Sequence, residues 1–93
     1  MNEKYLVDWT AQFKRDYKRA AKRGRDLSKI NAVIAKLANG ETLPPADRDH
    51  ALTGNWMRHR EYHIAPDWLL IYQIHENILI LELTRTGTHS DLF

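Results

Sequence analysis

The spacing of apolar residues in the N-terminal part of the chain changes from a two-residue period to a helical one. Tyr5, Val7 and Trp9 alternate with polar residues, and this alternation predicts a first β-strand. Thr10 follows as a candidate N-cap. After it, the apolar residues of TAQFKRDYKRAAKRG recur with helical spacing until Gly24 ends the pattern. The chain is therefore predicted to begin with a strand and an amphipathic helix.

A second helical pattern follows directly. Asp26 or Ser28 can cap its start, and the asparagine–glycine pair at positions 39–40 stops it. Its predicted buried stripe consists of Ile30, Val33, Ile34 and Leu37. Because only a tight loop separates the two helical patterns, they predict a helical hairpin.

Three β-type runs occupy the second half of the chain, after the connector ETLPPADRDHALTGN, which is rich in turn-forming residues. They span residues 56–64, 68–74 and 78–84, and the short segments APD and HEN between them favour antiparallel pairing. The predicted order is β-α-α-β-β-β, an α+β fold with an antiparallel sheet packed on a two-helix hairpin. At 93 residues, the chain is expected to form a single domain over residues 1–93.

Composition excludes several classes of protein. With no cysteine, the chain can form neither disulfides nor a thiolate zinc site. The first residues lack the apolar run of a signal peptide, and no segment approaches membrane-spanning length. We therefore expect a soluble, cytoplasmic protein with no membrane partner.

Positive charge is concentrated in the first predicted helix. Residues 14–25 hold seven Lys or Arg against one acid, Asp16, although the whole chain has a formal net charge of only +2. Such a basic helix favours a polyanion or an acidic protein as partner, and a solvated helix face is the alternative. The candidate contact residues are Lys14, Arg15, Lys18, Arg19, Lys22 and Arg23.

Histidines and a carboxylate are the candidate catalytic groups, because histidine exchanges protons near neutral pH. His63 and Asp67 flank the turn between the first two β-type runs, and an antiparallel meander can bring His89 to the same edge of the sheet. His50, in the connector, can fold over either end. Taken one at a time, these residues also fit solvated loops and turns, as His75 does, while His59 fits the exposed face of the sheet.

Metal-dependent chemistry is not expected, because no two histidines lie four apart in a predicted helix or form a His-x-His pair. The residue set instead favours metal-free acid–base cleavage of RNA, whose 2′-hydroxyl is an internal nucleophile. That reaction needs a base, an acid and cationic donors for the phosphate. Arg60 and Arg85 are candidate phosphate donors, and Phe93 can hold a base by stacking.

Three segments, DHALTGNW, YHIAPDWLLIY and RTGTHSDLF, resemble the signatures of YafQ-type toxins of bacterial toxin–antitoxin modules, within the RelE/ParE superfamily. The resemblance covers essentially the whole chain. It implies a RelE-like fold and a ribosome-dependent mRNA interferase that cuts the codon in the ribosomal A site. It also places the family's functional set on His50, His63, Asp67, His89 and Phe93.

The resemblance further implies a role for each of these side chains. His89 is the expected general acid, His50 and His63 the candidates for base and phosphate contact, and Asp67 the group that orients one of them. Glu61 stands where an aspartate is expected, and its additional methylene moves the carboxylate by over ~1 Å. The expected products are a 2′,3′-cyclic phosphate and a 5′-hydroxyl.

Partners are implied as well. Toxins of this kind pair with dimeric, DNA-binding antitoxins of the DinJ or RelB type, whose C-terminal segment wraps the toxin. The basic helix would bind rRNA phosphates on the 70S ribosome. Two alternatives remain open: a ParE-like toxin that acts on DNA gyrase without catalytic histidines, and a non-catalytic RNA- or ribosome-binding module.

Overall fold

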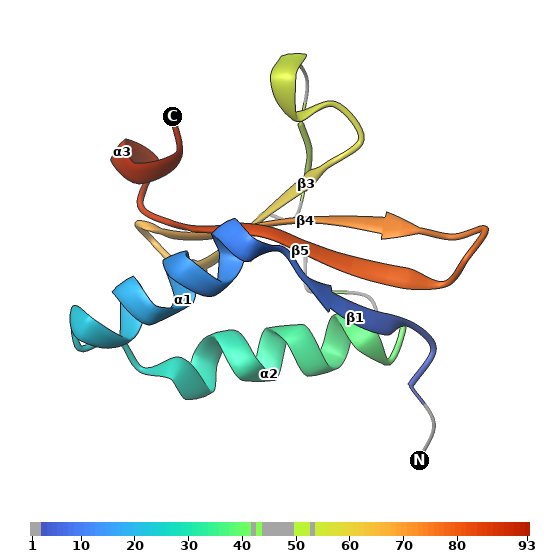
Figure 1. The fold of residues 1–93 in the computed structure, drawn as a ribbon, viewed down its shortest axis with the longest axis horizontal. Coiled ribbons are helices and arrows are strands. Elements are labelled where there is room, and N and C mark those ends of the chain that lie inside the picture. The colour runs from blue at the N-terminus through green and yellow to red at the C-terminus, as the bar shows by residue number, and fades with distance from the viewer. Residues whose placement is uncertain (1–2, 42, 44–49, 53) are drawn as a thin grey trace.

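The computed structural model describes residues 3–41, 43, 50–52 and 54–93, and Figure 1 shows a sheet with helices on both sides. The elements, in order, are β1 (Leu6–Trp9), α1 (Ala11–Lys22), α2 (Leu27–Ala38), β2 (His50–Ala51), a 3₁₀ turn (Gly54–Trp56), β3 (Arg60–Ala65), β4 (Trp68–His75), β5 (Ile80–Gly87) and α3 (His89–Leu92). The predicted α+β fold and its order of strands and helices are confirmed, with β2 and α3 as additions.

The two long helices begin and end where the sequence predicts. The Thr10 side chain accepts a hydrogen bond from the Phe13 backbone N–H at 3.0 Å and caps α1. Of the two candidates for the second cap, Asp26 is the one used, and Ser28 donates to it. Gly24, just beyond the C-cap of α1, has a φ of +77°, a conformation that glycine adopts without steric cost.

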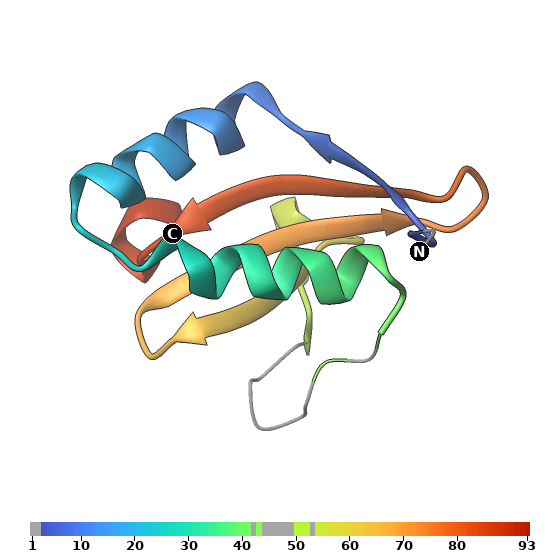
Figure 2. The ribbon, with the colours of Figure 1, turned by 90° about the horizontal axis from the view of Figure 1, so that it is seen from below.

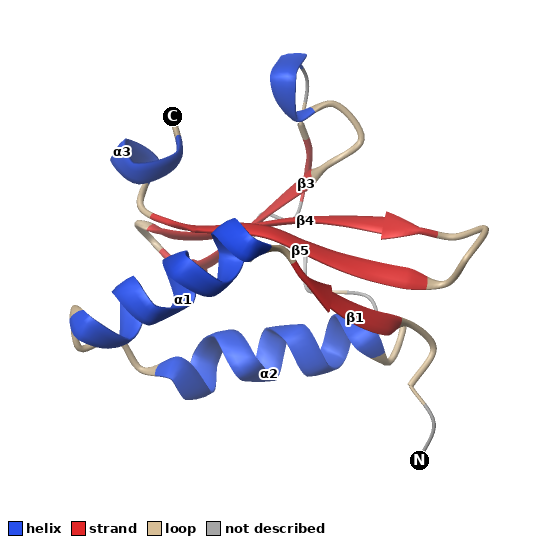
Figure 3. Cartoon of the chain, in the orientation of Figure 1, coloured by secondary structure: helices blue, strands red, loops and turns tan. Residues whose placement is uncertain are grey.

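The sheet has the strand order β1-β5-β4-β3-β2. β3, β4 and β5 form the predicted antiparallel meander, with β4 at its centre (Figure 3). The sheet is not antiparallel throughout, however, because β1 pairs with β5 in parallel, with Leu6 opposite Ile80. Two helices and the meander separate these strands along the chain, which is a connection long enough for parallel pairing.

Two predicted strand boundaries are wrong, and positive φ angles explain both. The run predicted over residues 56–64 begins only at Arg60, because Arg58 has a φ of +70° after the 3₁₀ turn. The run predicted over residues 78–84 begins at Ile80, after Leu79 with a φ of +54°. β5 then continues to Gly87, so part of the tail that was expected to follow the last strand belongs to the sheet.

α1 and α2 cover one face of the sheet, and α3 with the 3₁₀ turn lies on the other (Figures 1 and 2). Alternate residues of β4 divide between these faces. Trp68, Leu70 and Tyr72 belong to the larger core beneath the helices. Leu69 and Ile71 face the other side, where a second apolar cluster includes Leu92 of α3. Within the described residues, no helix is long and apolar enough to cross a membrane.

Candidate active site

Asp67 and His89 meet at the end of the sheet where the β3–β4 turn lies beside α3. The Asp67 carboxylate accepts two hydrogen bonds from His89, one from the backbone N–H at 3.1 Å and one from Nδ1 at 2.9 Å. These bonds, the side-chain one first, hold the pKa of Asp67 below its ordinary value. Because an ionised carboxylate can only accept, Nδ1 of His89 carries the hydrogen and Nε2 is left as its second reactive nitrogen.

α3 presents His89 through a capping box. The Thr88 side chain accepts from the Asp91 N–H, and the Asp91 carboxylate accepts from the Thr88 N–H at 2.9 Å. The His89 side chain is 53% exposed. The site therefore places an oriented imidazole where a substrate in solution can reach it.

His63 lies beside His89, with ring centroids 5.7 Å apart. It stands opposite Leu69 in the β3–β4 register, on the face of the second apolar cluster. Its Nε2 lies 3.4 Å from Oε1 of Glu61, a buried residue two positions earlier on the same face. The fold therefore brings His63, Asp67 and His89 together, as predicted, and adds the Glu61 carboxylate to them.

Phe93 extends the cluster along an aromatic row. Its ring centroid is 6.5 Å from that of His89 and 6.3 Å from that of Trp56, and the side chain is largely exposed. Trp56 packs edge-to-face on Phe93, although the sequence pattern had placed it in a strand. Its position at the end of DHALTGNW, one of the segments that carry the family resemblance, was the signal that could have identified it.

His50 is one strand away from the cluster. It lies in β2, and its Cα pairs with that of Glu61 across the β2–β3 ladder. Neighbouring strands in a sheet lie about 4.8 Å apart. The backbone of His50 therefore borders the site, while its side chain lies outside what the structure describes.

Of the two predicted phosphate donors, Arg60 lies on the other face of the sheet, whereas Arg85 pairs with Ile71 on the face of the site but is bound by a carboxylate. Arg60 pairs with Tyr72, so the alternation of the strand puts it on the face that α1 and α2 cover, opposite to Glu61 and His63. Arg85 donates from Nε to Oδ2 of Asp16 at 2.7 Å and from Nη2 to Oδ1 at 3.2 Å. Its guanidinium is thus engaged by a carboxylate of α1.

Arg25 brings positive charge to the site instead. Its guanidinium lies over the Trp68 ring, 5.1 Å from the centroid, and Nη2 approaches the Asp67 carbonyl oxygen at 3.5 Å. Its charge also contributes, after the bonds from His89, to the low pKa of Asp67. Arg25 is the last residue of the basic segment over residues 14–25, so the sequence shows its charge. Its position next to Asp67 follows only from the fold, in which the end of α1 lies beside the β3–β4 turn.

The basic helix divides into two sets of side chains. Arg19 and Arg23 turn toward the site, where Nη1 of Arg23 lies 2.7 Å and Nη2 of Arg19 lies 3.8 Å from Oδ2 of Asp91. The bond from Arg23, then the bonds from Thr88, and last the charge of Arg19 keep the pKa of Asp91 well below its usual range. The other set consists of the exposed side chains of Lys14, Arg15, Lys18 and Lys22.

Asp16 is the acid that attaches α1 to the sheet. β1 pairs with β5 only as far as Leu83, so the edge of β5 beyond that residue faces α1. There the buried Asp16 carboxylate accepts from the Thr86 backbone N–H at 3.2 Å, as well as from Arg85. A lone acid in a strongly basic helix was the sequence signal for this role.

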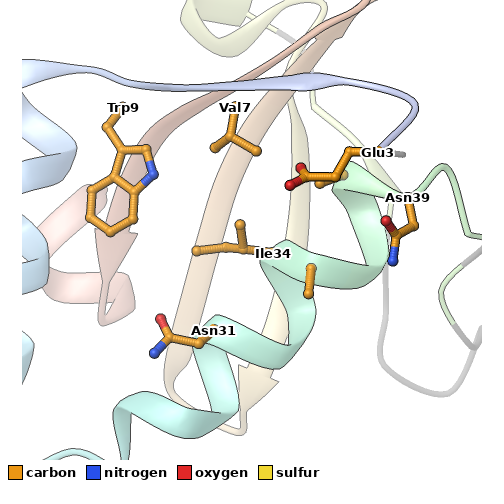
Figure 4. A pocket seen from close by; sticks show the side chains of 8 residues that line it. Glu3, Val7, Trp9, Asn31, Ile34 and Asn39 are labelled. Atoms are coloured by element: carbon orange, nitrogen blue, oxygen red, sulfur yellow. The ribbon is translucent and has the colours of Figure 1, made fainter. Parts of the chain in front are cut away.

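A groove on the helix side of the sheet is a separate feature. It has a volume of about 480 Å³ and lies between β1 and α2 (Figure 4). Its lining consists of Glu3, Val7, Trp9, Asn31, Ile34, Ala35, Ala38 and Asn39. Among these residues Glu3 alone is ionisable, so the groove lacks the paired proton-transfer groups that the histidine cluster has.

Three side chains of the cluster could also hold a metal ion. One donor atom each from Glu61, His63 and His89 lie within 4.8 Å of one another. Local ligand spacings in the sequence led us to expect no metal site. The fold supplies the proximity instead, by bringing α3 against β3.

Comparison with known proteins identifies relatives over nearly the whole chain. The family described as "Bacterial toxin of type II toxin-antitoxin system, YafQ" matches residues 5–93. The mRNA interferase toxin YafQ of Escherichia coli strain K12 is 39% identical over 88 residues, which are 94% of each chain.

Solved structures agree with this similarity. The E. coli DinJ–YafQ toxin–antitoxin complex contains a chain that is 36% identical with a TM-score of 0.88, covering 97% of this chain and 98% of that one. A metal-bound toxin from Helicobacter pylori is 38% identical with a TM-score of 0.89, covering 96% of this chain and 99% of that one.

Proposed function

Because the chain belongs to the YafQ family of bacterial type II toxin–antitoxin toxins, we propose that it is an mRNA interferase that cleaves mRNA in the ribosomal A site. The contact between Asp67 and His89, with His63 beside them, carries this proposal. Two imidazoles and an orienting carboxylate are the groups that acid–base cleavage of a phosphodiester requires. The relative named as an mRNA interferase supports the same activity.

Cleavage begins with the substrate's own 2′-hydroxyl. His63 accepts its proton, and the Glu61 carboxylate 3.4 Å from the ring stabilises the imidazolium that results. His50 is the second candidate base, since its backbone lies one strand from Glu61. The oxygen that loses its proton attacks the adjacent phosphorus and forms a 2′,3′-cyclic phosphate.

His89 completes the reaction as general acid. Its protonated ring gives the Nε2 proton to the departing 5′-oxygen, so the second product ends in a 5′-hydroxyl. Asp67, 2.9 Å from Nδ1, stabilises the positive charge that His89 carries before this transfer and holds the ring in orientation. Arg25 adds positive charge near Asp67, and the exposed Phe93 ring offers a surface for stacking a base.

Two macromolecular partners follow from this function. A cognate antitoxin is expected, as in the DinJ–YafQ complex of the relative. On the ribosome, the exposed lysines at positions 14, 18 and 22 share one face of α1 because they are four residues apart. Such a row of cations can bind rRNA phosphates, with an affinity that falls as salt rises.

The nuclease proposal is tested by primer extension on an mRNA under translation, comparing the wild type with His89→Gln. We expect the wild type to give cleavage products that the variant lacks. The matched control is His75→Gln, because His75 also contacts a carboxylate, at 3.3 Å from Glu82, but lies at the far end of β4. Equal cleavage by His89→Gln and the wild type would refute the proposed acid.

Ribosome binding is tested separately by replacing Lys14, Lys18 and Lys22 with glutamate. Cosedimentation with ribosomes should be lost, while the fold is kept because these side chains are exposed. Arg19 and Arg23 are unsuitable for this experiment, since their contacts with Asp91 would be lost as well. Undiminished cosedimentation of the triple variant would exclude this face as the anchor.

A further inference from the structure

We propose that Glu61, His63 and His89 form a binding site for a divalent transition-metal ion of the zinc type, and that the bound ion inhibits the proposed nuclease. The inhibitory part rests on the proposed function, whereas the binding site rests on the donor atoms alone. These atoms come from β3 and from the first residue of α3, and all three lie within 4.8 Å of one another.

The separation of the donor atoms fits a tetrahedral ion. Zinc binds imidazole nitrogen and carboxylate oxygen at roughly 2.0–2.2 Å, so neighbouring donors of a tetrahedron lie about 3.4 Å apart. Oε1 of Glu61 and Nε2 of His63 are 3.4 Å apart, which is already this separation. His89 needs to approach the other two by at most about 1.4 Å, and its half-exposed side chain can move.

The hydrogen bond between His89 and Asp67 also favours metal binding. Histidine ligands commonly donate their second ring N–H to a carboxylate, which fixes the tautomer and raises the basicity of the ligating nitrogen. Asp67 makes this contact with Nδ1 at 2.9 Å, so Nε2 is the nitrogen directed to the ion. Two neutral imidazoles and one carboxylate, with water in the fourth position, match the His₂Glu ligand set of zinc enzymes.

The type of donor also selects among ions. Mg²⁺ and Ca²⁺ prefer six or more oxygen ligands, whereas this site offers two nitrogens and one carboxylate. Another histidine–carboxylate group lies on the sheet, where Glu82 is 4.0 Å from His59 and 3.3 Å from His75. In the described part of the chain, the donor atoms of that second group are not all close to one another. The group therefore provides a matched control.

Inhibition follows from the use of the same atoms for two purposes. A metal–nitrogen bond at His89 occupies the Nε2 lone pair that the proposed general acid needs for its proton. A bond at His63 removes the nitrogen that lies beside Glu61. The ion would therefore stabilise the folded toxin while preventing proton transfer.

Binding is tested by titrating the full chain with Zn²⁺ in a calorimeter, with Mg²⁺ as the control ion. We expect one equivalent of Zn²⁺ to bind the wild type and His75→Gln equally. Glu61→Gln and His89→Gln should bind at least about ten-fold more weakly, and Asp67→Asn about ten-fold more weakly through its effect on His89. His89 is half exposed, so its variant keeps the test valid even if replacing the buried Glu61 impairs folding.

Two outcomes overturn the site: no Zn²⁺ binding by the wild type, or binding that His89→Gln leaves unchanged. RNA cleavage, measured with and without saturating Zn²⁺, then tests inhibition. Loss of cleavage in Zn²⁺ that returns on chelation supports it, and unchanged cleavage overturns it while the site stands. If the metal-free wild type does not cleave RNA, the proposed function fails, and calorimetry still decides the metal site.

Discussion

Replacing Arg23 by glutamine should loosen α3 and with it the position of His89. Arg23 donates to Asp91 from both terminal nitrogens of its guanidinium, from Nη1 to Oδ2 at 2.7 Å and from Nη2 to Oδ1 at 3.3 Å. Asp91 in turn closes the capping box that begins α3, and His89 is the first residue of that helix. A four-residue helix has little stability of its own, so it depends on contacts of this kind.

The size of the stability loss follows from how exposed Arg23 and Asp91 are. The Arg23 side chain is 45% exposed, which limits the gain, while the Asp91 side chain is only 14% exposed and the contact is bidentate. We therefore expect a small loss of stability for Arg23→Gln, at the upper end for an exposed pair. Asp91→Asn should cost about 2 kcal/mol, because it also weakens the capping box and the contact with Arg19.

Amide hydrogen exchange measures this loss where it occurs. The Leu92 and Phe93 amides donate to the carbonyls of Thr88 and His89 within α3, so their exchange reports its opening. Their exchange should become several-fold faster in Arg23→Gln, with little change in the melting temperature of the whole domain. RNA cleavage should fall in parallel.

The control is Arg15→Gln. Arg15 is also an exposed cation of the basic segment, but it donates to Gln12 and does not contact Asp91. Exchange at the two α3 amides should not change in this variant. If Arg23→Gln also leaves exchange unchanged, or if Arg15→Gln speeds it equally, the contact between α1 and α3 does not hold His89.

Three further predictions concern the same region. The lowered pKa of Asp91 means that its stabilisation is complete above its unfolded pKa of 3.8 and is lost as pH falls toward the folded value. In an acid titration, the stability difference between wild type and Asp91→Asn should therefore begin to narrow only below about pH 4 and close only as pH approaches the folded pKa. Gly87→Ala should displace α3 and lower cleavage, because a Cβ there would stand 2.9 Å from Cβ of Asp91; unaltered α3 amide shifts in NMR spectra would contradict this. Asp16→Asn should cost about 3 kcal/mol in urea unfolding, because it leaves Arg85 without its buried counter-charge, and a loss below about 1 kcal/mol would show that the charge of Asp16 matters little.

Local rules predicted the elements because each was encoded within a few neighbouring residues. Thr10 and Asp26 are caps whose partners lie two or three positions away, so the helices began where expected. The parallel pairing of β1 with β5 was missed because its partners are more than seventy residues apart. The positive φ of Arg58 was missed for a different reason, since arginine is not among the residues that favour this conformation.

The proximity of His63, Asp67 and His89 could be predicted because the topology alone determined it. His63 and Asp67 flank one turn and His89 follows the antiparallel neighbour, so their meeting required only the meander.

Arginines could not be assigned in this way, because a flexible cation adopts the position of its strongest carboxylate partner. Arg85 was a reasonable phosphate donor on sequence grounds, yet the buried Asp16 lies 2.7 Å from its Nε. Charge near the site comes instead from Arg25, whose guanidinium is held by the Trp68 ring and the Asp67 carbonyl. A basic segment therefore predicts that cations are available, and only the placement of the acids decides which of them remain for a phosphate.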